Sequence, residues 1–170
     1  MVVASSIRKR SVTGYCTNWC PHSRRVKALL DRYQIPYANI DIESDPAATR
    51  QVEAWNRGYR SVPTMVFQLI VTEPRPSELE MILLDSQADL MAMTAYVTDW
   101  CPDSRQTMAW LREHRIGCTT INIEQNPEAA AKVKEWNQGL LSVPTLEMTL
   151  RLTEPTGEQI ESVLGLGSGL

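Results

Sequence analysis

The strongest constraint on this chain is that its two halves repeat one another. The offset from Cys20 to Cys101 is 81 positions, and the same offset relates 12–84 to 93–165 without gaps. About 30 of roughly 73 aligned positions are identical, far more than chance gives within one chain. The 170 residues are therefore expected to form two small domains of the same fold rather than one larger domain.

The repeat also sets the expected boundaries. We expect an N-terminal leader at 1–10, a first domain at 11–84, a polar linker at 85–91, a second domain at 92–165 and a loose, glycine-rich tail at 166–170. The leader lacks the apolar segment of a secretory signal. As a short terminal segment, it is expected to be frayed. Domains this small bury a limited core, so we expect the two to stabilise each other.

The order of elements predicts the fold of each domain. In the first domain we expect a strand at 11–16, a helix at 24–33, a strand at 37–42, a helix opened by Asp45-Pro46, two short strands within 62–71 and a last helix from Pro76. No glycine, asparagine or aspartate marks a turn between the two short strands. The second domain repeats this order. The pattern predicts an α/β fold in which each domain is a four-stranded mixed sheet with helices on both faces.

A cysteine stands at the expected start of a helix in each half. Pro21 follows Cys20, and proline suits the first helical position because its missing N–H needs no partner there. The free N–H groups and the helix dipole put partial positive charge at this end, which stabilises a thiolate and lowers the cysteine pKa from about 8.5. Cys101 and Pro102 repeat the arrangement. Both cysteines are therefore candidate nucleophiles.

These residues resemble the glutaredoxin branch of the thioredoxin-like fold. The features that carry the resemblance are a strand, then Trp-Cys-Pro-x-Ser at a helix start, then Ser-Val-Pro-Thr before an apolar strand, once per repeat. The resemblance implies a thiol–disulfide oxidoreductase. It also implies that Pro63 and Pro144 are cis and lie beside the sulfur, while Val62 and Val143 offer backbone groups to the peptide-like part of a bound thiol.

Further residues are expected to line the first site. Trp19 would form one wall, and Arg57 and Arg60 in the loop before Pro63 would donate to a ligand carboxylate. His22 either tunes the thiolate when charged or is a plain surface residue. The substrate-binding set that we predict is Trp19, Pro21, His22, Ser23, Arg57, Arg60, Val62, Pro63, Val143 and Pro144.

The pattern departs from glutaredoxins that have two active-site cysteines. Ser23 stands three residues after Cys20, where those proteins have the second cysteine. The resemblance therefore implies a monothiol cycle, in which the Cys20 thiolate attacks a mixed disulfide and an external small thiol releases the bound sulfur. Thr72-Glu73-Pro74 and Thr153-Glu154-Pro155 replace the glutathione-gripping stretch of that family and look more like mycoredoxins. Glutathione or another small thiol is thus the expected co-substrate, with no tightly bound cofactor.

The two halves differ in charge around the cysteine. Cys101 has Asp99 and Asp103 nearby, whereas Asn18 and His22 hold these positions beside Cys20. Carboxylates close to a thiolate raise its pKa by like-charge repulsion. We therefore expect the first repeat to carry the reactive site and the second to be weaker or vestigial; the alternative is that both work.

Cys16 has no counterpart in the second repeat, because Val97 stands there. It is either a small buried strand residue or a resolving cysteine that forms a disulfide with Cys20, which would make a dithiol reductase. A third possibility is a scaffold without turnover, in which Cys20 and Cys101 share an iron–sulfur cluster with two small thiols. Cys118 is expected to be structural.

Composition narrows the remaining classes. The formal net charge is −3 with acidic and basic residues mixed, so neither nucleic acid nor a membrane is an expected partner. The four cysteines lack the paired spacing of a disulfide framework or a zinc site, so no metal is expected and a reducing, cytoplasmic location is the simplest interpretation. The expected partners are a small thiol and a disulfide-containing client protein.

Overall fold

The computed structural model describes residues 5–166. The first repeat consists of β1 (Ile7–Cys16), α1 (Pro21–Arg32), β2 (Tyr37–Asp41), α2 (Pro46–Trp55), β3 (Thr64–Thr72), α3 (Pro76–Glu80) and a π-helical turn, η1 (Met81–Asp85). The second consists of β4 (Asp89–Val97), α4 (Pro102–Glu113), β5 (Thr119–Asn122), a 3₁₀ turn, η2 (Ile123–Gln125), α5 (Pro127–Trp136), β6 (Thr145–Thr153) and α6 (Gly157–Val163). None of the helices within residues 5–166 has both the length and the apolar character needed to cross a membrane.

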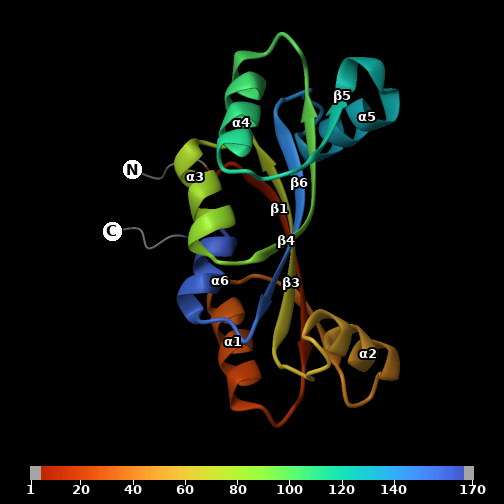
Figure 1. Ribbon diagram of the computed structural model, residues 1–170, viewed down its shortest axis with the longest axis vertical. Helices are drawn as coiled ribbons and strands as arrows, with labels where there is room; N and C mark the ends of the chain where they lie inside the picture. Colours follow the sequence, from red (N-terminus) through yellow and green to blue (C-terminus); the bar gives the residue numbers. More distant parts are fainter. Residues whose placement is uncertain (1–4, 167–170) are drawn as a thin grey trace.

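All six strands form one continuous sheet in the order β2-β1-β3-β6-β4-β5 (Figure 1). The outer pairs, β1 with β2 and β4 with β5, are parallel, and the three inner pairings are antiparallel. Figure 1 shows α1, α3, α4 and α6 on one face of the sheet and α2 and α5 on the other. The predicted α/β class, a mixed sheet with helices on both faces, is confirmed.

The predicted pair of short strands within 62–71 is wrong. Each repeat has a single strand of nine residues there, β3 or β6. Without a residue suited to a tight turn the chain stays extended, and Met65, Phe67 and Leu69 alternate into the core along its length. Each end of the molecule still has four strands side by side, but the fourth strand comes from the other repeat.

The exchange is symmetric about the centre of the sheet. β3 and β6 pair along all nine residues, with Gln68 opposite Thr149, its counterpart at the offset of 81. Thr64 therefore lies opposite Thr153, and Thr72 opposite Thr145, so the end of each strand meets the beginning of the other. After this crossing α6 of the second repeat lies against α1 of the first, where a Cβ added at Gly157 would be 3.6 Å from Leu29 Cδ2.

Three predicted boundaries need correction. The leader at 1–10 ends earlier, because β1 begins at Ile7 and Ile7, Lys9 and Arg10 pair with the second half of β3. The linker at 85–91 shrinks to 86–88, because η1 extends to Asp85 and β4 begins at Asp89. Residues 1–4 and 167–170, which belong to the predicted leader and tail, lie outside the described residues. β1 and β4 can begin earlier than predicted because the unbroken strands β3 and β6 give each of them a longer partner.

The helix starts follow the expected sequence signals. The Asp45 carboxylate caps α2 by accepting from the N–H groups of Ala47 and Ala48, both at 3.1 Å, and Pro46 occupies the first position. Asn126 caps α5 in the same way. One large apolar cluster spans both repeats and includes β3, β6 and all four helices of one face. The two repeats therefore share a core rather than having one each.

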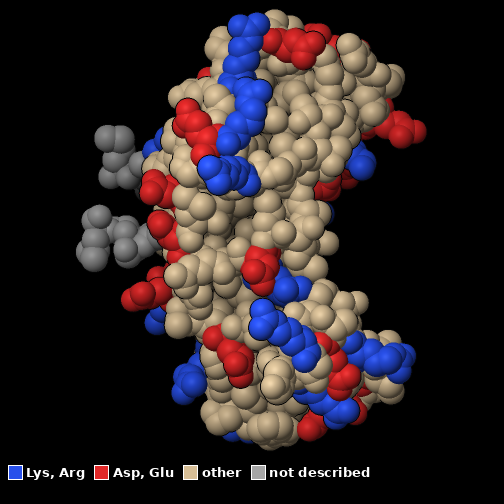
Figure 2. All heavy atoms as spheres, viewed as in Figure 1, with Lys and Arg blue, Asp and Glu red and all other residues tan. Residues whose placement is uncertain are grey.

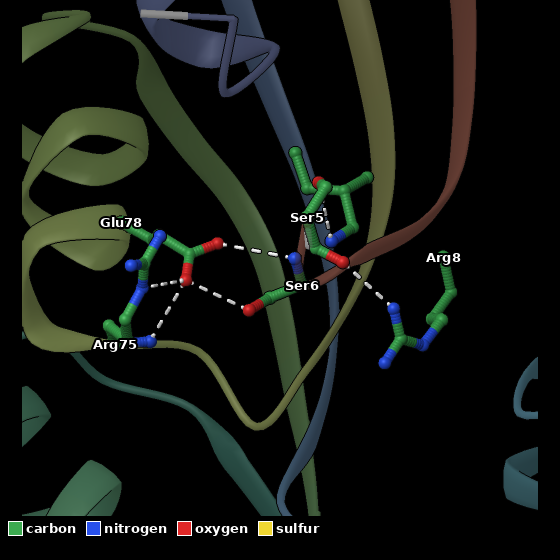
Figure 3. Close-up of polar contacts among 6 residues, drawn as sticks. Ser5, Ser6, Arg8, Arg75 and Glu78 are labelled. Carbon is green, nitrogen blue, oxygen red and sulfur yellow. Dashed lines mark hydrogen bonds and ion pairs between the residues drawn. The ribbon is translucent and has the colours of Figure 1, made fainter. Parts of the chain in front are cut away.

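The start of β1 is fastened to α3 by the Glu78 carboxylate (Figure 3). It accepts from the hydroxyl of Ser6 at 2.9 Å and from its N–H at 3.3 Å, and it pairs with Arg75 at 2.9 Å. Burial, the largest influence, raises the pKa of Glu78, but the Arg75 side chain and the Ser6 donors together hold it below its usual range.

Basic and acidic residues are interspersed over the surface, which narrows to a waist between the two ends (Figure 2).

Candidate active site

The structure places both candidate nucleophiles at the N-cap of a helix. Cys20 caps α1 with φ −72° and ψ 117°, and Cys101 caps α4 with φ −74° and ψ 121°. Each residue is only 8% exposed. The Cys20 sulfur faces the carbonyl of Val62 at 4.0 Å, and the Cys101 sulfur faces that of Val143 at 3.7 Å. The two thiols therefore occupy equivalent, partly covered positions.

The pKa of Cys20 lies below its usual value. Burial is the largest influence and raises it, but the N–H and hydroxyl of Ser23 and the N–H of His22 stabilise the thiolate, and together they outweigh burial. The charge of Glu154 acts in the opposite direction and raises the pKa slightly. Donors at the first turn of α1 thus favour the thiolate, which is the nucleophilic form.

Buried hydroxyls surround each sulfur in the same pattern. Thr17 and Ser23 beside Cys20, and Thr98 and Ser104 in the second repeat, each have a buried hydroxyl oxygen without a hydrogen-bond partner in the described part of the chain. A buried hydroxyl without a partner costs free energy. A thiolate would accept from the serine hydroxyl, and the influence of Ser23 on Cys20 agrees with this role.

The loop before each cis proline is held by the other repeat. The Val62–Pro63 and Val143–Pro144 peptide bonds are cis, as the resemblance implied. The N–H of Glu154 donates to the carbonyl of Pro63 at 2.8 Å, and the N–H of Glu73 donates to that of Pro144 at the same distance. Each active-site loop is therefore completed by a Thr-Glu-Pro segment from the opposite half.

Asn56 adds a contact between the two repeats at the Cys20 end. Its amide donates to Thr64 Oγ1 at 3.1 Å, next to the cis proline, and its carbonyl oxygen accepts from Thr153 of the second repeat at 2.8 Å. His22 adds another link, because its Nε2 lies 2.7 Å from the carbonyl oxygen of Pro155. A carbonyl oxygen can only accept, so His22 carries a proton on Nε2. His22 is thus a bridge between repeats and not a plain surface residue.

The tryptophan before each cysteine is held by a glutamate. Trp19 is 61% exposed, and its ring N–H donates to Glu43 at 2.8 Å. Trp100 matches it, with its ring N–H donating to Glu124 at 2.7 Å. Each indole is therefore held in a fixed position beside a cysteine although much of the ring is open to solvent.

The arginines predicted to bind a ligand carboxylate are unequal. Arg60 already pairs with Glu53 through its Nε at 2.6 Å, which leaves it less suited to a ligand. Arg57 is exposed and lies in the left-handed region at φ 56°. In the second repeat, Leu141 stands where Arg60 does and is half exposed. The Cys101 end is thus more apolar around its cis proline.

A groove of about 430 Å³ lies between the two repeats at the end of the molecule that holds Cys20. Its walls are α1 on one side and the start of α6 on the other. The lining residues are His22, Arg25, Val26, Leu29, Pro155, Thr156, Gly157 and Ile160.

Cys16 is close to Cys20 but poorly suited to attack. It is fully buried at the end of β1, and burial, the largest influence, raises its pKa, while Lys27 and the Ser23 side chain lower it in part. A thiol with a raised pKa is seldom ionised at neutral pH. All four cysteines are free, and Cys118 lies just before β5 with its sulfur 3.9 Å from Thr120 Oγ1.

Cys20 and Cys101 of one chain cannot hold the same iron–sulfur cluster. The helices that these cysteines cap, α1 and α4, lie at opposite ends of the long axis (Figure 1). Within residues 5–166 no group of three or more histidine, cysteine or acidic side chains gathers where it could hold a metal ion.

The sequence did not reveal that Glu73 and Glu154 belong to the opposite cysteine. The sequence placed each only in the Thr-Glu-Pro stretch of its own repeat. The missing turn within 62–71 was the available signal, since an unbroken strand must carry the next segment away from its own repeat.

Comparison with known proteins agrees with this geometry. The family model described as glutaredoxin matches residues 12–68 and 93–148, more than half of the chain. Both matched segments end at the middle of β3 or β6, where the exchange between repeats begins.

Two bacterial relatives are similar over part of the chain. A Mycobacterium tuberculosis (strain H37Rv) protein provisionally named a glutaredoxin is 39% identical over 67 residues, which are 39% of this chain and 80% of that protein. Mycoredoxin 1 of Corynebacterium glutamicum is 40% identical over 55 residues, 32% of this chain and 67% of that protein. The chain belongs to the glutaredoxin family, a family of thiol–disulfide oxidoreductases, and carries the family's domain twice.

Proposed function

We propose that this protein reduces mixed disulfides between client proteins and a small thiol, with Cys20 as the nucleophile. The observation that carries the proposal is the lowered pKa of Cys20, in which donors from Ser23 and His22 outweigh the opposing effect of burial. A lowered pKa increases the thiolate fraction at neutral pH, and a thiolate attacks a disulfide without a general base.

The cycle needs one cysteine and two molecules of small thiol. The Cys20 thiolate attacks the small-thiol sulfur of the mixed disulfide, and the client leaves as a thiolate that takes a proton from water. A second small-thiol thiolate then attacks the sulfur bound to Cys20. This step releases a symmetric small-thiol disulfide, one half of which arrived in the mixed disulfide, and restores the Cys20 thiolate, so each cycle consumes one free small thiol to reduce the client.

Ser23 supports the monothiol form of this cycle because it holds the place of a second cysteine and is buried next to the sulfur. We propose the Cys101 end as the weaker site. Asp99 and Asp103 place two carboxylates there, and the Asp99 side chain accepts from Asn122 at 3.2 Å. A reducing, cytoplasmic setting would suit this chemistry and stays a prediction.

A dithiol cycle through Cys16 is the second candidate, and the interaction of the two cysteines, whose charges influence each other, favours it. The raised pKa of Cys16, caused first by burial, counts against it. Reduced protein exposed to glutathione disulfide, followed by intact and peptide mass spectrometry, separates the two cycles. Cys20→Ser and Cys16→Ser are the matched variants.

A glutathione adduct on Cys20 that persists in Cys16→Ser is the expected result. Loss of two mass units without an adduct, absent from both variants, would replace the monothiol cycle by the dithiol one. If glutathione disulfide leaves the protein unmodified, cystine is the next probe. Failure of both disulfides to modify Cys20 would contradict catalysis at this residue.

A further inference from the structure

Each reactive cysteine faces a Thr-Glu-Pro segment from the opposite repeat, which we call the crossed segment. Residues 153–155 form it at the Cys20 end, and residues 72–74 form it at the Cys101 end. At the Cys20 end it is tied down twice, by the 2.8 Å bond from Glu154 N–H to the Pro63 carbonyl and by the 2.7 Å contact from His22 to Pro155. The segment therefore cannot move away from the cysteine without breaking contacts between the repeats.

The glutamates of both crossed segments have an unusual backbone conformation. Glu154 has φ 49° and Glu73 has φ 48°, in the left-handed region that residues other than glycine, asparagine and aspartate seldom adopt. Such a conformation persists where the surrounding contacts determine it. Here the N–H of each glutamate donates to a cis-proline carbonyl, which fixes the residue beside the sulfur at both ends.

The carboxylate of Glu154 is available to a substrate. The residue is exposed, and its side chain makes no hydrogen bond or ion pair with any residue among 5–166. Among the charges that influence the Cys20 thiol, after the larger effect of burial, Glu154 is the one that raises its pKa. Because the N–H of Glu154 also binds the carbonyl of Pro63, which follows the Val62 carbonyl that faces Cys20, a group bound to Cys20 through a disulfide lies close to this carboxylate.

We propose that Glu154 of the second repeat is a specificity-determining residue for Cys20, and Glu73 of the first repeat for Cys101. Each favours a disulfide whose small-thiol part carries a cationic or hydrogen-bond-donating group near the sulfur and disfavours one with a carboxylate there. The proposal rests on the proposed function in that it names the substrate class of the same site. It also means that neither repeat holds a complete site of its own.

Thiol reagents of opposite charge test this on the full chain without turnover. The probes are 2-(trimethylammonium)ethyl and 2-sulfonatoethyl methanethiosulfonate. In both, the Cys20 thiolate attacks the sulfenyl sulfur, the S–S bond breaks, methanesulfinate leaves and a mixed disulfide forms. The background is Cys101→Ser with Cys118→Ser, and peptide mass spectrometry follows Cys20. The quantity measured is the ratio of the cationic to the anionic rate constant.

Glu154→Gln should lower this ratio by about threefold or more at low salt, because a lost negative charge slows the cation and speeds the anion. Glu73→Gln, the matched control, should leave the ratio at Cys20 unchanged. In a Cys20→Ser background with Cys101 intact the two variants should exchange roles. Glutamine keeps the length of the side chain, and circular dichroism checks that the fold is retained.

The outcomes are distinct. A shift at Cys20 from Glu73→Gln but not from Glu154→Gln would overturn the crossed assignment, and no shift from either would overturn the specificity role. Because the reagents report on charge and not on catalysis, a crossed shift together with absent glutathione chemistry would sink the proposed function and leave this inference standing.

Discussion

Replacing Ser23 with alanine should raise the pKa of the Cys20 thiol. Burial is the largest influence and already raises that pKa, and the Ser23 hydroxyl is one of three donors that reverse it. The Ser23 side chain is fully buried, and the same hydroxyl also lowers the pKa of Cys16 in part. Alanine removes this donor and keeps the backbone N–H groups of Ser23 and His22, so the shift isolates one hydrogen bond.

The magnitude follows from that single bond. A hydrogen bond to a charged group contributes about 1.5–3 kcal/mol, and one pKa unit corresponds to about 1.4 kcal/mol. Two remaining donors partly compensate, so we take the lower end, a rise of about one unit. Below both pKa values the thiolate fraction then falls about tenfold, while the more basic thiolate is intrinsically more nucleophilic, which leaves a rate about three- to fourfold lower.

The assay is the pH dependence of Cys20 alkylation by iodoacetamide, followed by peptide mass spectrometry. The midpoint for Ser23→Ala should lie at higher pH than that of the unmodified chain. Ser104→Ala is the matched control, because that hydroxyl lies in the first turn of α4 next to Cys101 and should not move the Cys20 midpoint. An unmoved midpoint in Ser23→Ala would show that the hydroxyl does not stabilise the thiolate.

Three further predictions concern the fold. Glu78→Gln, which introduces the residue found at position 159, should lower the free energy of unfolding by about 1 kcal/mol at pH 7. Since the folded pKa of Glu78 is depressed, this difference should shrink as pH falls below the unfolded pKa of glutamate, about 4.3, and vanish below the lower folded pKa in denaturant titrations. Phe67→Ala should cost about 3–5 kcal/mol and keep a single unfolding transition, because the core is shared; two transitions would contradict this. Residues 5–88 alone should form a dimer by light scattering, since Gln68 would meet its own copy as it meets Thr149; a monomer would refute it.

Much of the fold and of the sites could be predicted from local sequence signals. Asp45 with Pro46 marks a helix start, and the cysteine followed by proline places each sulfur at a helix N-terminus. Such features depend on residues close in sequence, so a pattern of a few letters specifies them. The cis geometry at Pro63 came from the family resemblance and agrees with the structure.

The exchange of strands could not be predicted in the same way. Nothing in the residues of β3 says which strand will pair with its second half, because any extended apolar segment offers the same backbone groups. The absence of turn residues within 62–71 indicates only that the two short strands do not form a hairpin. Which partner takes its place depends on the register of Gln68 opposite Thr149, a contact between positions far apart in the chain.

The crossing changes how the difference between the two ends should be understood. Both crossed segments have the same sequence, Thr-Glu-Pro, so they do not distinguish the two sites. The two ends differ instead in a pair of residues that line the groove at the Cys20 end, where Leu29 of the first repeat faces Gly157 of the second. At the other end the corresponding positions hold Trp110 and Pro76, both larger. The smaller residue of each corresponding pair lies at the Cys20 end, and the two come from different repeats, so the groove is a property of the pairing and of neither repeat alone.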